Sequence, residues 1–446
     1  MKHLIRLLSV LLIAVMLLCP LASCAGRSGK TLMTLNYEKT KVTLSVNFYR
    51  FQLSRLKGSF VGYGYTNNGG SASDDAFWAI QDTFGDSGQL QTWDEYYRAQ
   101  VLETCKIYLV GLWYFKKEGL SLSETAKTNI QQELDDIVAD YGNGSKTKLN
   151  AVLAPFGMNY RLLKDAYETE AKLETVQNFL YGTNAATLGE NVKNEYLNAH
   201  YLHFKQIFFA KYEYEYIKDV NGDTVYYDGN GNILYDETNG YTHKDDKNNP
   251  ITDENGKTVY YISDSSEKIN YDKVNGNPKY KTDANGNVIR RELTQDELAS
   301  VKSDAEATFS AVKDATAEVF EARMLSENGE SEYSDGYYLL RGTDYSAVSS
   351  DLAYLSQIAE MLDSMTVGEV KMLESTDGYH IIRRYAPTDG AYDMEVNEVW
   401  FSTFADGLMA ELFLKKCDLY LPQISVSDSV LSSVPSIADI EPNYYF

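Results

Sequence analysis

Residues 375–385 read STDGYHIIRRY, an Asp-Gly turn followed by an alternating run. Alternation after a turn is typical of a β-strand. Successive side chains of a strand point to opposite faces, so His380 and Ile382 share one face and Ile381 lies on the other. The stretch therefore predicts a strand that presents one histidine, either as a functional group or as a partly buried structural residue.

The length, composition and charge of the chain limit the classes of function that it can have. The chain has 446 residues, enough for more than one domain, and 44% of them are hydrophobic. The formal net charge of −23 argues against a nucleic-acid partner, because contacts with phosphates require a basic surface. The 36 tyrosines provide stiff amphipathic surface, which suits protein contacts and also suits strands.

The first 23 residues have the features of an export signal. Two basic residues precede an apolar run over 7–18, which is too short for a comfortable membrane span. Leu-Ala-Ser-Cys follows at 21–24, with the thiol at Cys24, and the whole segment resembles a bacterial lipoprotein signal. The resemblance implies that Cys24 is lipidated, that residues 24–36 form a tether, and that the protein is anchored to the outer face of the bacterial cytoplasmic membrane. An ordinary secretory signal is the alternative.

Residues 37–200 are predicted to be mostly helical. Apolar residues recur at three- and four-residue steps over 93–118, and 160–180 is a second long amphipathic stretch. A Ser-x-x-Glu capping box at 121–124 starts another helix.

Two parts of the chain resemble known families. The DGYHII run, preceded by Thr-Val-Gly-Glu-Val at 366–370, resembles the end of parvulin-type peptidyl-prolyl isomerase domains, and HFKQIFFA at 203–210 stands where that family has its first strand. The helix order of 37–200 is similar to the chaperone domain of extracytoplasmic foldases of the PrsA and SurA kind. These resemblances imply an α+β protein with a parvulin-like α/β domain over 201–387. They also imply that a helix and strand in 388–446 return to complete the N-terminal domain. We expect the tail from residue 435 to be loose.

Residues 212–292 interrupt the parvulin order between the first strand and the first helix. The run DTVYY at 223–227 is nearly repeated by KTVYY at 257–261. The segment also contains several Asn-Gly dipeptides, which are a strong hairpin signal. They begin at residues 221, 239, 255, 275 and 285, and a further turn, DGNGN at 228–232, contains another. We predict an inserted, acidic, tyrosine-rich β-hairpin array, followed by a capping box at 294–297 and one helix to about residue 323.

The parvulin resemblance implies a site around His380. His380 matches the second catalytic histidine of that family, Gln206 stands in place of the first, and Asn328 stands in place of its Cys or Asp. The candidate substrate-binding residues are Ile358, Tyr354 and Phe208. Because only His380 matches the family residue, we expect isomerase activity that is weak or absent.

Two functions fit the sequence. The first is a lipid-anchored foldase that binds unfolded or secreted polypeptides. The second is a cell-surface or wall-binding lipoprotein that uses the hairpin array as an adhesin module. Neither requires a cofactor or a metal. Cys105 and Cys417 fit free core thiols better than a disulfide, because they show no framework spacing.

Overall fold

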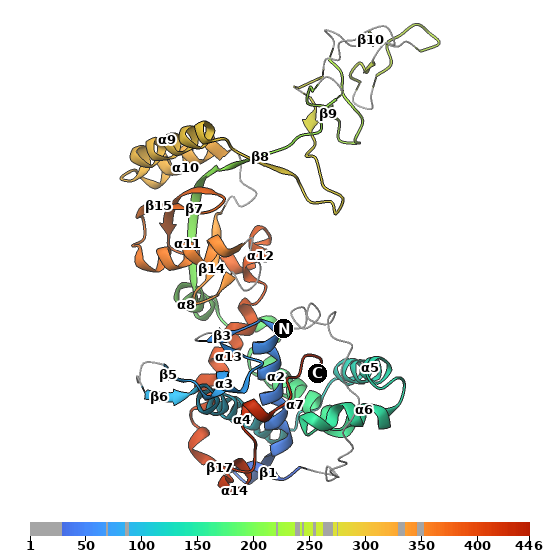
Figure 1. Cartoon of the computed structure of the whole chain (residues 1–446), viewed down its shortest axis with the longest axis vertical. Coiled ribbons are helices and arrows are strands. Elements are labelled where there is room, and N and C mark those ends of the chain that lie inside the picture. The colour runs from blue at the N-terminus through green and yellow to red at the C-terminus, as the bar shows by residue number, and fades with distance from the viewer. Residues whose placement is uncertain are drawn as a thin grey trace. The chain divides into compact units, whose positions relative to one another are not determined.

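The fold is given by a computed structural model of the chain (Figure 1). The structure describes residues 29–67, 70–84, 89–219, 222–236, 241–242, 245–252, 256–261, 271–273, 275–328, 335–345 and 352–446. The predicted signal segment and Cys24 lie outside these residues. The chain divides into two compact units, the first ending at Tyr196 and resumed by Phe401–Phe446, the second spanning Leu197–Trp400. Helices and strands occur in both, so the class is α+β.

The first unit is mostly helical. Its helices are α2 (Val46–Gly62), α3 (Asp75–Ala79), α4 (Trp93–Lys117), α5 (Glu124–Asp140), α6 (Lys146–Leu153), α7 (Tyr160–Tyr181), α13 (Phe404–Cys417) and α14 (Asp428–Leu431), and α8 (Glu190–His200) leads into the second unit. Its strands are β1 (Thr31–Tyr37), β2 (Thr40–Ser45), β3 (Thr66–Asn67), β4 (Gly70–Ser71), β5 (Gln81–Phe84), β6 (Gln89–Thr92) and β17 (Ile424–Val426). None of the described helices combines the length and apolar character needed to span a bilayer.

The tether predicted over 24–36 is wrong from Thr31 onward. That part is β1, the middle strand of a three-stranded antiparallel sheet in the order β17-β1-β2. Met33 lies opposite both Leu44 and Val426, so the C-terminal segment adds a strand to the first unit. Leu32 and Met33 are both fully buried. A strand buried on both faces loses the alternating pattern, which is why the sequence did not reveal it.

Helix starts follow local capping. Thr92 and Glu95 form a complete capping box at the start of α4. α5 begins after Ser123, whose hydroxyl accepts the N–H of Ala126, and not at the box predicted from residue 121. Cys105 and Cys417 are both free and buried, which agrees with core thiols.

The second unit contains a four-stranded antiparallel sheet in the order β14-β7-β16-β15. The strands are β7 (Tyr201–Ala210), β14 (Tyr337–Leu340), β15 (Val370–Glu374) and β16 (Gly378–Tyr385), and the helices are α9 (Gln295–Val312), α10 (Ala317–Asn328), α11 (Ala353–Ser364) and α12 (Glu398–Phe401). β7 and β16 pair in one register from Gly378 opposite Ala210 to Tyr385 opposite His203. The predicted adjacency of these distant strands is confirmed.

Each face of this sheet packs on its own helices. Ile382 lies in a cluster with Ile358 and Leu362 of α11. Ile381, on the opposite face, lies in a second cluster with Val312 of α9 and Phe320 of α10. The expected single helix to residue 323 is therefore wrong. It breaks after Val312, whose carbonyl accepts the N–H of Ala315, so two shorter helices reach the sheet.

The insert is built from short strands and tight loops. The strands are β8 (Tyr212–Tyr214), β9 (Tyr226–Tyr227), β10 (Tyr241–Thr242), β11 (Tyr260–Tyr261), β12 (Asn277–Pro278) and β13 (Arg290–Glu292). In five loops of the described residues an Asp carboxylate accepts one or two backbone N–H groups across the turn, and these loops begin at Asp219, Asp228, Asp245, Asp272 and Asp283. These N–H groups lower the pKa of Asp228, Asp245 and Asp283.

Hairpins are closed by antiparallel bridges between Lys218 and Thr224, Tyr227 and Ile233, Thr252 and Thr258, and Thr282 and Val288. The hairpin expected at Asn275 is wrong. The described residues on its two sides do not pair with each other. They pair with residues earlier in the chain, Tyr271 with Tyr235 and Asn277 with Tyr227. The Asn-Gly at 239 lies outside the described residues.

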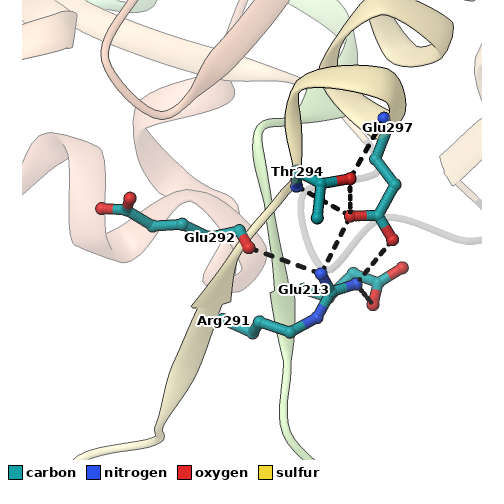
Figure 2. A network of polar contacts seen from close by, with 5 residues as sticks. All are labelled: Glu213, Arg291, Glu292, Thr294 and Glu297. Atoms are coloured by element: carbon teal, nitrogen blue, oxygen red, sulfur yellow. Dashed lines mark hydrogen bonds and ion pairs between the residues drawn. The ribbon is translucent and has the colours of Figure 1, made fainter.

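One arginine ties the insert to the helix that follows it. Figure 2 shows Arg291 of β13 facing Glu297 at the start of α9 and Glu213 of β8. Its guanidinium donates to both carboxylate oxygens of Glu297 at 2.9 and 3.0 Å and to Glu213 at 2.6 Å. Glu297 also closes the predicted capping box with Thr294. Hydrogen bonds from Arg291 and Thr294 lower the pKa of Glu297 to about 2, which keeps this contact ionic.

Candidate functional site

His380 sits on the α11 side of the sheet, opposite Phe208 of β7. The backbone N–H and C=O of Phe208 are both bound by the side chain of Asn328, so they point away from β16. His380 and Phe208 are therefore a non-hydrogen-bonded pair, the type that brings facing side chains closest together. The His380 side chain is buried, with 2% exposure.

Both ring nitrogens of His380 are engaged. Nδ1 lies 3.0 Å from Oε1 of Gln206, and Nε2 lies 2.9 Å from Oγ of Ser375. A carbonyl oxygen can only accept, so we assign the proton to Nδ1, which donates to Gln206. In this tautomer Nε2 accepts a hydrogen bond from the Ser375 hydroxyl, and the neutral imidazole is satisfied at both ends.

Ser375 holds this arrangement at the turn before β16. Its hydroxyl oxygen accepts the N–H groups of Asp377 and Gly378, each at 3.2 Å. Ser375 is itself buried. No role for Ser375 was predicted from the sequence. The local signal was there, because a serine at the start of a Ser-Thr-Asp-Gly turn commonly accepts the backbone N–H groups two and three residues later.

Two aromatic rings enclose the imidazole. Phe208 lies 4.7 Å from it at 33°, and Tyr354 of α11 stacks on it at 5.2 Å and 11°. Ile358 lies one helical turn after Tyr354. It is fully buried in the hydrophobic cluster that α11 forms with Ile382 of β16. Phe208 and Tyr354 thus contact His380, whereas Ile358 belongs to the hydrophobic core.

The surroundings keep His380 uncharged. Burial, with a smaller contribution from the positive charge of Lys211, lowers the pKa of His380 from its ordinary value near 6.5 to about 4. The Lys211 ammonium donates to the Ser375 carbonyl at 2.8 Å and to Glu374 at 2.7 Å. The imidazole is consequently neutral at pH 7, where it can donate or accept hydrogen bonds but carries no charge.

The side chain of Asn328 contacts the main chain of β7. Its amide accepts from Phe208 N–H at 3.3 Å and donates to Phe208 C=O at 3.0 Å, in the manner of a residue on a neighbouring strand. The structure therefore brings Gln206, Phe208 and Tyr354 to His380, while Asn328 contacts the backbone edge of β7. Among the described residues, no group of three or more His, Cys, Asp and Glu could hold a metal ion.

Comparisons with known proteins find similarity among solved structures. Neither the protein-family models nor the curated proteins contain a match to this chain. Among solved structures, the foldase protein PrsA from Streptococcus pneumoniae str. Canada MDR_19A matches with 13% identity, covering 78% of this chain and 97% of that chain. The TM-score is 0.21, which does not establish a shared overall fold.

Proposed function

We propose that the protein is a lipid-anchored extracytoplasmic foldase that binds unfolded polypeptides, with a parvulin-like domain whose isomerase activity is weak or lost. The observation that carries the proposal is the long antiparallel pairing of β7 with β16, with His380 and Gln206 facing each other on the α11 side. Completion of the first unit by β17 supports the same assignment, because a returning C-terminal segment is what the foldase resemblance implies.

The proposal of weak catalysis rests on the state of His380. Rotation about an X-Pro bond has a barrier of roughly 18–20 kcal/mol, and a catalyst must bind the twisted amide better than the planar one. Groups that achieve this must reach the carbonyl of the substrate. Both nitrogens of His380 are already bound, its ring is buried, and Asn328 is bound to backbone.

The foldase function is tested by aggregation. Light scattering of reduced, denatured lysozyme is followed on dilution with and without the purified protein, and with serum albumin at equal mass as the control. We expect the protein to delay scattering more than albumin does. Equal scattering with the two proteins would remove the foldase proposal.

The catalytic part is tested separately. Exchange between the cis and trans forms of a proline-containing peptide is measured by NMR with wild-type protein, His380→Ala and a parvulin of known activity. We expect the wild type to give little acceleration. A rate close to that of the parvulin, lost in His380→Ala, would show that the site is catalytic.

A further inference from the structure

The stem of the insert has two different faces. Tyr212 and Tyr214 of β8 share a face, and Tyr216, two residues further along at an isolated bridge, continues the same alternation. Residues directly opposite in an antiparallel pair also share a face, and Arg290 lies opposite Tyr214 and Tyr280 opposite Tyr216. The other face carries charged pairs, Arg291 with Glu213 and Lys281 with Glu215.

The four tyrosines of the first face form a continuous row. Ring centroids are 5.3 Å apart for Tyr212 and Tyr214, 4.8 Å for Tyr214 and Tyr280, and 5.1 Å for Tyr216 and Tyr280. We call these four residues the tyrosine row. Tyr214 and Tyr216 are each 36% exposed and Tyr280 is 45% exposed. Tyrosines this exposed form an accessible aromatic surface, of the kind that marks interaction sites.

Rings in the insert already bind cations of the chain. The Arg290 guanidinium lies 4.3 Å from the ring centre of Tyr212 and 5.7 Å from that of Tyr214. The ammonium of Lys279 lies 4.4 Å above Tyr227. A cation over an aromatic face is attracted by the ring quadrupole, so rings in this environment are suited to arginine and lysine side chains.

The negative charge of the chain also favours a partner rich in arginine and lysine. Residues 212–292 contain sixteen Asp and Glu against ten Lys and Arg, and the whole chain has a net charge of −23. A basic segment is attracted to such a surface over a distance of about a Debye length, whereas a second copy of the chain or an anionic lipid surface is repelled.

We propose that the tyrosine row binds extended, arginine- and lysine-rich segments of unfolded polypeptides. The inference rests on the proposed foldase function, and it names the client chemistry that the insert adds. Alternating side chains of an extended segment would meet successive rings, because both repeat along a strand direction.

The test uses a labelled unstructured peptide in which arginine alternates with serine, and a matched peptide with glutamate in place of arginine. Binding to the purified protein is followed by fluorescence anisotropy. The triple variant Tyr214→Val/Tyr216→Val/Tyr280→Val keeps strand-favouring residues but removes the rings, and the triple Tyr→Phe variant keeps the rings. Tyr63→Val is the control, because Tyr63 is also 45% exposed but lies in the first unit.

We expect the arginine peptide to bind and the glutamate peptide not to bind. The triple valine variant should weaken binding about tenfold or more, since each exposed cation–π contact is worth a factor of about two to five. The triple phenylalanine variant and Tyr63→Val should bind like wild type. Unchanged binding by the triple valine variant, or equal binding of the two peptides, would overturn the inference.

Two further outcomes separate this inference from the proposed function. A wild-type protein that suppresses lysozyme aggregation but does not bind the arginine peptide would overturn the tyrosine row as a client site and leave the foldase proposal standing. The protein could instead bind purified cell wall through the tyrosine row and fail to bind the arginine peptide. That result would show that the row recognises carbohydrate, and it would also overturn the inference.

Discussion

The imidazole of His380 and the side-chain amide of Gln206 are joined by a hydrogen bond of 3.0 Å between two strands that are more than 150 residues apart in sequence. Gln206 supplies a neutral acceptor at the position where the parvulin resemblance implies the first of two histidines. The pair is polar, uncharged and held from the other side by Ser375. This arrangement makes the stability of the second unit depend on a small buried polar network.

Replacing Gln206 should destabilise the second unit. In Gln206→Leu the Nδ1–H of buried His380 loses its acceptor, and an unsatisfied buried donor costs about 1–3 kcal/mol. Urea unfolding followed by circular dichroism measures the change in free energy. The control is Gln357→Leu on α11, where the side chain is exposed. An equal loss in the two variants would contradict the role given to Gln206.

Stability should fall as the pH falls from about 6.5 through about 4, in part because of His380. Burial lowers the pKa of His380 to about 4 in the folded chain, so in this range the unfolded chain binds a proton that the folded chain does not. The full effect of a shift this large is roughly 3 kcal/mol. Carboxylates also titrate here, so the measurement is the difference between wild type and His380→Gln in unfolding free energy across pH. A difference that does not change with pH would contradict the lowered pKa.

The C-terminal tail should detach when Gly58 gains a side chain. A Cβ at Gly58 would lie 2.0 Å from the backbone oxygen of Asn443, so the tail has to move in Gly58→Ala. We expect a loss of roughly 1–3 kcal/mol, the usual cost of overpacking, and faster amide hydrogen exchange over residues 437–446. Gly189→Ala is the control, since no heavy atom lies within 4 Å of its Cβ. Unchanged exchange in the tail of Gly58→Ala would show that the tail is not held against α2.

Lipidation should depend on Cys24. Cells that express the protein are grown with an alkyne-labelled palmitate, and the label is read on the purified chain. We expect labelling and partition into the detergent phase for wild type, and neither for Cys24→Ser. Cys19→Ser, five residues earlier in the same segment, should be labelled like wild type. Label that persists in Cys24→Ser would contradict the lipoprotein prediction.

Several features were readable from local sequence because they depend on neighbouring residues. The Thr294–Glu297 capping box predicted the start of α9, and the turn and alternation after residue 376 predicted β16. Where long-range pairing competed with local signals, the predictions were wrong. β1 is buried on both faces and shows no alternation, and the Asn275 turn joins two arms that pair elsewhere. The tail from residue 435 was expected to be loose, yet Ile437 and Phe446 are buried and Arg55 donates to the Phe446 carbonyl at 2.7 Å.

The sequence by itself determined the turn, the strand and the face on which His380 lies, because a strand has a strict two-residue repeat and an Asp-Gly turn has few conformations. Only the tertiary structure decided what surrounds that histidine. Ser375 and Gln206 bind its two nitrogens, Tyr354 covers its ring, and Asn328 is drawn to the free edge of β7 instead. These contacts depend on the register between distant strands and on the packing of α11, and neither is encoded in a local pattern.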